Sequence, residues 1–92
     1  MPTEQRWRSD TLGMHRQILI DHLAQAERHI AEGRVHVDRQ RQIVEDLVRD
    51  GKDAGRSRNL LELFEDTLAM HIAERDRLRT ELAEGVLQRR RI

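Results

Sequence analysis

Mostly apolar residues recur through the first half of the chain at intervals that alternate between four and three residues. After a first step of seven, they are Leu12, Leu19, Leu23, Ala26, Ile30, Gly33, Val37, Gln40, Val44 and Leu47. This spacing places one continuous stripe along a helix and is typical of a coiled-coil seam. Ser9, Asp10 and Thr11 come just before Leu12, and their side-chain oxygens can cap the free amides of a helix that begins near Leu12. The pattern predicts a helix over about residues 11–50, after a flexible leader at residues 1–9 that contains Trp7.

A second stripe follows in the other half of the chain. Its members, again three and four apart, are Leu61, Phe64, Leu68, His71, Arg75, Leu78 and Leu82. They predict a second helix over about residues 54–88. A later start, at Ser57 or Asn59, is the competing interpretation, because Gly55 is a poor helix residue and the four residues from Asn59 resemble a capping box.

The stretch Asp50-Gly51-Lys52-Asp53 separates the two patterns. Gly51 stands where a left-handed residue commonly ends a helix, and the carboxylate of Asp53 can cap the next one. A turn of only residues 51–53 forces the two helices to lie antiparallel and adjacent. The sequence therefore predicts an all-α fold with one domain over residues 10–92, a long antiparallel helical hairpin.

A turn centred near Lys52 would place residues opposite each other when their numbers sum to about 104. Phe64 would then face Gln40, and His71 would face Gly33. A glycine inside a helix costs about 1 kcal/mol relative to alanine. We therefore expect Gly33 to make room for the imidazole of His71.

A second set of apolar residues lies outside both seams: Ile43, Val48, Leu60, Leu63 and Met70. A lone hairpin would leave these side chains in water, and 92 residues arranged as two helices bury little apolar surface. We expect these five residues to form an interface through which two copies dimerise into a four-helix bundle.

The charges are balanced, with 17 basic and 17 acidic residues and no cysteine. A neutral chain has no overall attraction to nucleic acid or to an anionic membrane surface. No apolar run approaches the roughly 20 residues that a membrane span needs. We expect a cytoplasmic protein without nucleic-acid or membrane partners, whose basic end, Arg89 to Arg91, favours the dipole of the second helix.

Four histidines, His15, His22, His29 and His36, recur every seven residues beside the first seam. Neighbours in this row are about 10.5 Å apart along a helix, which is too far for two of them to share one metal ion. A metal site would need ligands from both helices, and the candidates are His29, Glu32, His36, His71 and Glu74. The favoured interpretation is a border row without metal, which would become charged on mild acidification and loosen the association.

Catalytic signatures are weak. The segment Leu78-Arg79-Thr80-Glu81-Leu82 resembles the end of the histidine-kinase phospho-acceptor motif, but Asp76 stands in place of the phosphorylated histidine and Glu81 in place of a proline. Ser9 and Ser57 stand at expected helix starts, where capping is their natural role. We expect no enzyme, no catalytic residues and no cofactor, with a phosphorelay hairpin as a minor alternative.

Three segments are similar to those of a group of short bacterial helical-hairpin proteins with no assigned activity. They are the run from Ala26 to Gly33, the turn from Asp50 to Asp53, and Leu68-Ala69-Met70-His71 followed by Asp76-Arg77-Leu78. Gly55 departs from the usual start of the second helix in that group. The resemblance implies a hairpin and adds no mechanism.

These observations together predict a small interaction or regulatory module that acts by homodimerisation and by binding a helix of another protein. The alternative is a helical bundle that binds a transition metal through histidine and glutamate, for sensing or storage.

Overall fold

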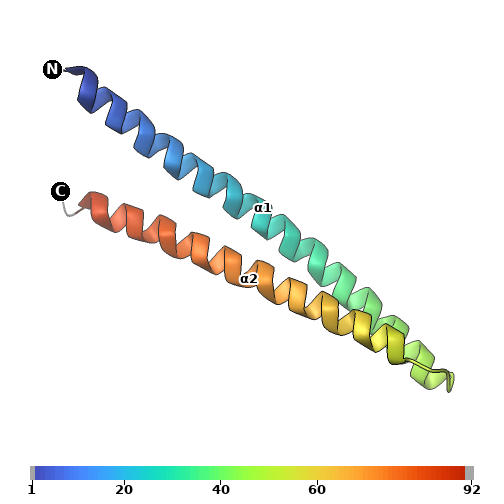
Figure 1. The fold of residues 1–92 in the computed structure, drawn as a ribbon. Helices are drawn as coiled ribbons and strands as arrows, with labels where there is room; N and C mark the ends of the chain where they lie inside the picture. The colour runs from blue at the N-terminus through green and yellow to red at the C-terminus, as the bar shows by residue number, and fades with distance from the viewer. Residues whose placement is uncertain (1, 91–92) are drawn as a thin grey trace.

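The computed structural model describes the backbone of residues 2–90 and the side chains of residues 14–85. Two helices, α1 (Pro2–Arg49) and α2 (Gly55–Arg90), run antiparallel and side by side (Figure 1). The molecule is a rod with extents of 76 × 21 × 14 Å. The all-α helical hairpin expected from the sequence is confirmed.

The start of α1 differs from the expectation. The helix begins at Pro2, so the backbone of residues 2–9 belongs to α1 and does not form a separate leader. Proline suits the first position of a helix, because its fixed φ angle is helical and the missing N–H is not needed there. The side chains of Trp7, of the seam position Leu12 and of the tail from Arg89 to Arg91 lie outside the described residues.

A local hydrogen-bond motif ends α1. Gly51 has a φ angle of 69°, in the left-handed region, as the sequence predicted. The N–H of Gly51 donates to the carbonyl of Val48 at 3.1 Å, and the N–H of Lys52 donates to the carbonyl of Leu47 at 2.9 Å. This pair of bonds is the Schellman motif, which satisfies carbonyls that a helix end leaves without partners.

The first turn of α2 is capped by a side chain. The Oδ1 atom of Asp53 accepts a hydrogen bond from the backbone N–H of Gly55 at 2.9 Å. The carbonyl of Ala54 then accepts from the N–H of Arg58 at 2.8 Å. The capping role predicted for Asp53 is confirmed, and the competing start of the second helix at Ser57 or Asn59 is wrong.

The two seams pack against each other along the hairpin. Every predicted seam position between Leu19 and Leu82 is buried or half-buried. The most buried apolar residues are Ala26, Ile30, Val37, Ala54 and Leu78. Leu78 is the most enclosed, with 1% of its surface exposed. Burial therefore follows the periodicity read from the sequence.

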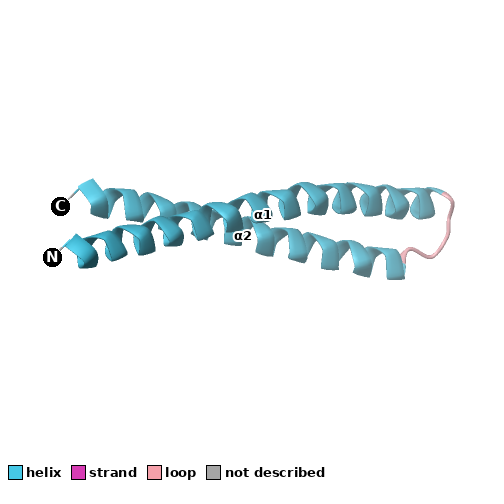
Figure 2. Ribbon diagram, turned by 90° about the horizontal axis from the view of Figure 1, so that it is seen from above, coloured by secondary structure: helices cyan, strands magenta, loops and turns pink. Residues whose placement is uncertain are grey.

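The alignment of the helices differs from the expected one by about one helical turn. Phe64 packs on His36 and not on Gln40, while Gln40 donates a hydrogen bond to the carbonyl of Ser57 at 3.0 Å. Figure 2 shows the reason: the last turn of α1 extends beyond the first turn of α2, and the connection folds back beside it. Ala54, in this returning segment, is buried.

Candidate functional site

One side of the seam is joined by ion pairs. A guanidinium nitrogen of Arg79 lies 3.4 Å from a carboxylate oxygen of Glu27, and Arg41 lies 3.8 Å from Glu65 in the same way. Both pairs link α1 to α2, and their side chains are about half exposed. Among residues 14–85, both salt bridges between the helices are on this side, which we call the ion-pair flank.

The histidines lie on the other side. Glu27 directly follows a seam residue, Ala26, whereas His29 directly precedes the next one, Ile30. In a heptad these two kinds of position border the seam on opposite sides. The two flanks of the hairpin therefore differ in chemistry.

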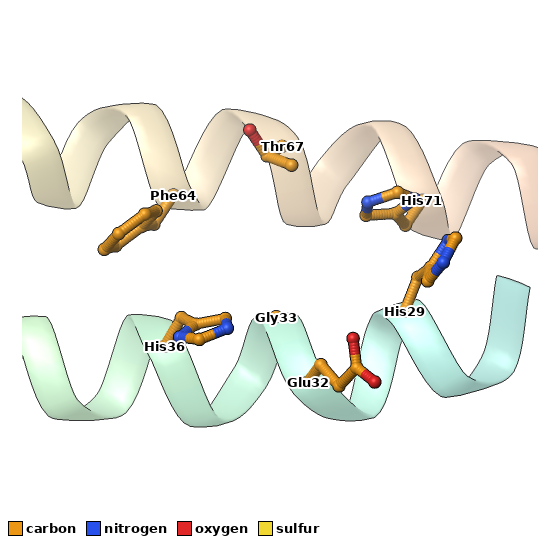
Figure 3. Close-up of a pocket in the computed structure, with 7 residues that line it drawn as sticks. All are labelled: His29, Glu32, Gly33, His36, Phe64, Thr67 and His71. Carbon is orange, nitrogen blue, oxygen red and sulfur yellow. The ribbon is translucent and has the colours of Figure 1, made fainter.

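A shallow pocket of about 150 Å³ opens on the histidine side (Figure 3). It lies between the middle of α1 and the facing part of α2. Its lining residues are His29, Glu32, Gly33, His36, Phe64, Thr67 and His71. Gly33 and Thr67 are small, which leaves space at the centre of this surface.

Gly33 allows the helices to approach at the pocket. A Cβ atom added at Gly33 would lie 3.2 Å from Cδ1 of Leu68, closer than most contacts of a real Cβ atom. The expectation that Gly33 makes room for the imidazole of His71 is therefore corrected. The one-turn difference in alignment places Leu68 against Gly33, and it places His71 about one turn nearer the start of α1, beside His29.

His71 instead meets His29. The ring centroids of these two imidazoles are 4.8 Å apart with 53° between their planes, and both side chains are half-buried. Figure 3 shows the ring of His29 reaching from α1 to lie beside the ring of His71 on α2. At the other end of the pocket, the rings of His36 and Phe64 have centroids 5.7 Å apart. Two aromatic contacts thus bridge the helices on this side.

Glu74 is engaged elsewhere. Arg77 donates to its two carboxylate oxygens at 2.6 and 3.1 Å, and also bonds Glu81. The hydrogen bond from Arg77, with the positive charges of Arg77 and His22, holds the pKa of the Glu74 carboxyl below its ordinary value. The carboxylate of Glu74 is thus paired with Arg77 on the surface of α2.

The candidate metal ligands are only partly brought together. His29, Glu32, His36 and His71 line one pocket, whereas Glu74 is not among its lining residues. Within the part of the chain whose side chains are described, no group of three or more histidine, aspartate or glutamate residues is arranged to hold a metal ion. Within this set, His29 and His71 are in ring contact across the two helices.

Exposed apolar side chains surround the pocket. Leu63 and Met70 stand four residues before and three residues after Thr67, so they share its side of α2. They are 58% and 71% exposed. Leu60, seven residues before Thr67, and Ile43, seven residues after His36, extend the same surface and are 40% and 42% exposed. We call this surface, the pocket with Ile43, Leu60, Leu63 and Met70, the histidine face.

The fifth residue of the expected interface, Val48, lies elsewhere. It is seven residues after Arg41, which places it in the row of the ion-pair flank. It is 51% exposed there. Four further exposed apolar residues lie outside the expected interface: Met14, Ile18, Ile20 and Val35. Counting steps of seven from Arg41 would have separated Val48 from the other four residues of the expected interface.

Neither helix, over the described residues, has an apolar stretch that could cross a lipid bilayer. Comparison with known protein families, with curated proteins and with solved structures found no match. The resemblance to bacterial helical-hairpin proteins stays a prediction, and the function is argued from the geometry.

Proposed function

We propose that this chain is a small, non-enzymatic interaction module that self-associates through its histidine face. The observation that carries the proposal is the difference between the two flanks. The ion-pair flank is bridged by charged side chains, whereas the histidine face presents four exposed apolar residues around a hollow. Exposed apolar surface gathered on one side of a small protein is typical of an interface.

A second copy of the chain is the occupant that fits this face. The same surface carries a hollow at Gly33 and Thr67 and projecting side chains, Leu63 and Met70, beside it. In a two-fold dimer each copy uses the same patch, so the projections of one copy can fill the hollow of the other. Two hairpins joined in this way form a four-helix bundle.

The thin core of one hairpin also favours association. Only five apolar residues are buried among those described, and two of them, Ala26 and Ala54, are alanines. A chain of 92 residues in two described helices packs one helix on the other through a single seam. A second layer of helices would be needed to cover the apolar side chains outside that seam. A partner hairpin would supply that layer.

The expected strength can be estimated from the exposed side chains. Completing the burial of Ile43, Leu60, Leu63 and Met70, which are about half exposed, gains about 1 kcal/mol for each. Eight such side chains in a dimer give about 8 kcal/mol, from which the costs of association, at least about 4 kcal/mol, must be subtracted. The remaining gain corresponds to a dissociation constant that can reach about 1 mM, so measurements should extend from micromolar to millimolar chain concentrations.

The test is sedimentation equilibrium of a double variant, Leu63→Ser with Met70→Ser. Removing these two side chains from a dimer interface should raise the dissociation constant at least about tenfold. The matched control is Val35→Ser with Val48→Ser, which removes two exposed apolar side chains outside the histidine face. The control should associate like the unchanged chain. Equal weakening by both double variants would contradict the assignment of the interface to this face.

Metal binding has weaker support as an alternative. His29 and His71 are the right residue types, but a structural or catalytic metal site generally uses three or four protein ligands. Glu74 is bonded to Arg77, and no third ligand of the described residues completes the pair. The geometry therefore favours self-association.

A further inference from the structure

We infer that protonation of the His29 and His71 pair controls the association, so that the dimer forms when both imidazoles are neutral and dissociates on mild acidification. This inference rests on the proposed self-association through the histidine face. It is narrower than the expectation from the sequence, in which the whole row of histidines acts together.

The pair differs from the two outer histidines of the row, His15 and His22. His29 and His71 are half-buried and in ring contact across the two helices. His15 and His22, earlier in the row, are exposed and do not line the pocket. A charge on either of these outer imidazoles stays in water, whereas a charge on the pair lies on the surface that a second copy would cover.

The charged groups around the pair cannot balance full protonation. From α1, Glu32 and His36 line the same pocket, and from α2 the pocket receives Phe64 and Thr67, which carry no charge. Three imidazoles thus share one carboxylate. Glu32 can compensate one imidazolium, and each further proton leaves net positive charge in the pocket.

Other charged groups near the pair on α2 already have partners. Glu74 is bonded by Arg77, and Arg75 pairs with Asp76 at 3.1 Å. These side chains are therefore poorly placed to neutralise His71.

Association makes the imbalance more costly. Two copies would bring six imidazoles and two Glu32 carboxylates into one interface, from which water is largely excluded. The charged imidazoles would lose solvation and repel one another, whereas the neutral rings would pack. Protons are then taken up when the dimer dissociates, and the dissociation constant must rise as pH falls.

The experiment is sedimentation equilibrium at pH 7.5, 6.5 and 5.5, with the helical content followed by circular dichroism. For the unchanged chain, the dissociation constant should rise at least about tenfold from pH 7.5 to 5.5 while the helical signal persists. The double variant His29→Gln with His71→Gln should lose most of this dependence. The matched control, His15→Gln with His22→Gln, removes two exposed histidines and should retain it.

The outcomes separate the two proposals. A dimer with the same dissociation constant at all three pH values overturns the inference and leaves self-association standing. A monomer at every pH overturns both. Loss of the pH dependence in the His15 and His22 variant, but not in the His29 and His71 variant, overturns the assignment to the pair.

A second measurement covers the case in which the double variant His29→Gln with His71→Gln does not associate at pH 7.5. The imidazole signals of the unchanged chain can be followed by NMR over the same pH range. The signals of His29 and His71 should titrate together with dissociation. If they titrate in a range where the oligomer mass is constant, the inference is overturned.

Discussion

At the scale of single residues, one glycine determines where α1 stops. Gly51 has a φ angle of 69°, and no atom lies within 4 Å of a Cβ placed there. The backbone conformation, and not lack of space, is therefore what requires glycine at this position. An L-residue in this region is strained by about 1 kcal/mol.

We predict that Gly51→Ala lowers the free energy of unfolding by about 1 kcal/mol, because the left-handed conformation must be kept for the Schellman bonds. Urea denaturation followed by circular dichroism measures this change. The matched control is Gly85→Ala, in the open interior of α2, where alanine should raise stability by up to about 1 kcal/mol. Equal effects of the two substitutions would show that the left-handed conformation at position 51 does not require glycine.

Residues that act locally could be predicted from the sequence. Gly51 and Asp53 each satisfy backbone groups within five residues of themselves, so their roles depend only on neighbouring sequence. The contact between His29 and His71 could not be predicted in this way. It joins residues on different helices and depends on an alignment that local patterns do not determine.

At the scale of the helices, periodicity predicted which faces are buried but not how α1 and α2 align. The seam follows from steps of three and four along one helix. The alignment follows from the path of the connection, which folds back beside the last turn of α1 (Figure 2). As a result Leu68, and not His71, packs on Gly33.

Gln40 is the buried polar residue of the seam, with 7% of its surface exposed among the described side chains. Its Nε2 atom donates to the carbonyl of Ser57, which lies inside α2 and also has a helical partner. A polar side chain at a seam position can fix how two helices align, at some cost in stability.

We predict that Gln40→Leu raises the free energy of unfolding by about 1 kcal/mol, since it replaces one hydrogen bond with apolar burial and leaves no buried group without a partner. Urea denaturation at a fixed chain concentration gives the value. A loss of stability of similar size would instead mean that the hydrogen bond from Gln40 to Ser57 contributes much of the free energy that favours the observed alignment of α1 and α2.

At the scale of the whole molecule, the two long sides of the hairpin differ in chemistry. Glu27–Arg79 and Arg41–Glu65 bridge one side, while the other carries the pocket and most of the exposed apolar surface near the turn. Self-association could be proposed from chain length and apolar content alone. The face itself could not, because it is built from α1 and α2 together and Val48 falls outside it.

The most direct test of this account is the mass of the unchanged chain in solution. Sedimentation equilibrium at pH 7.5, at chain concentrations from about 1 μM to 1 mM, spans the range in which the estimated dimer should form. The account predicts a species of twice the chain mass of 10.9 kDa, whose share grows with concentration. A single-chain mass throughout this range would contradict it.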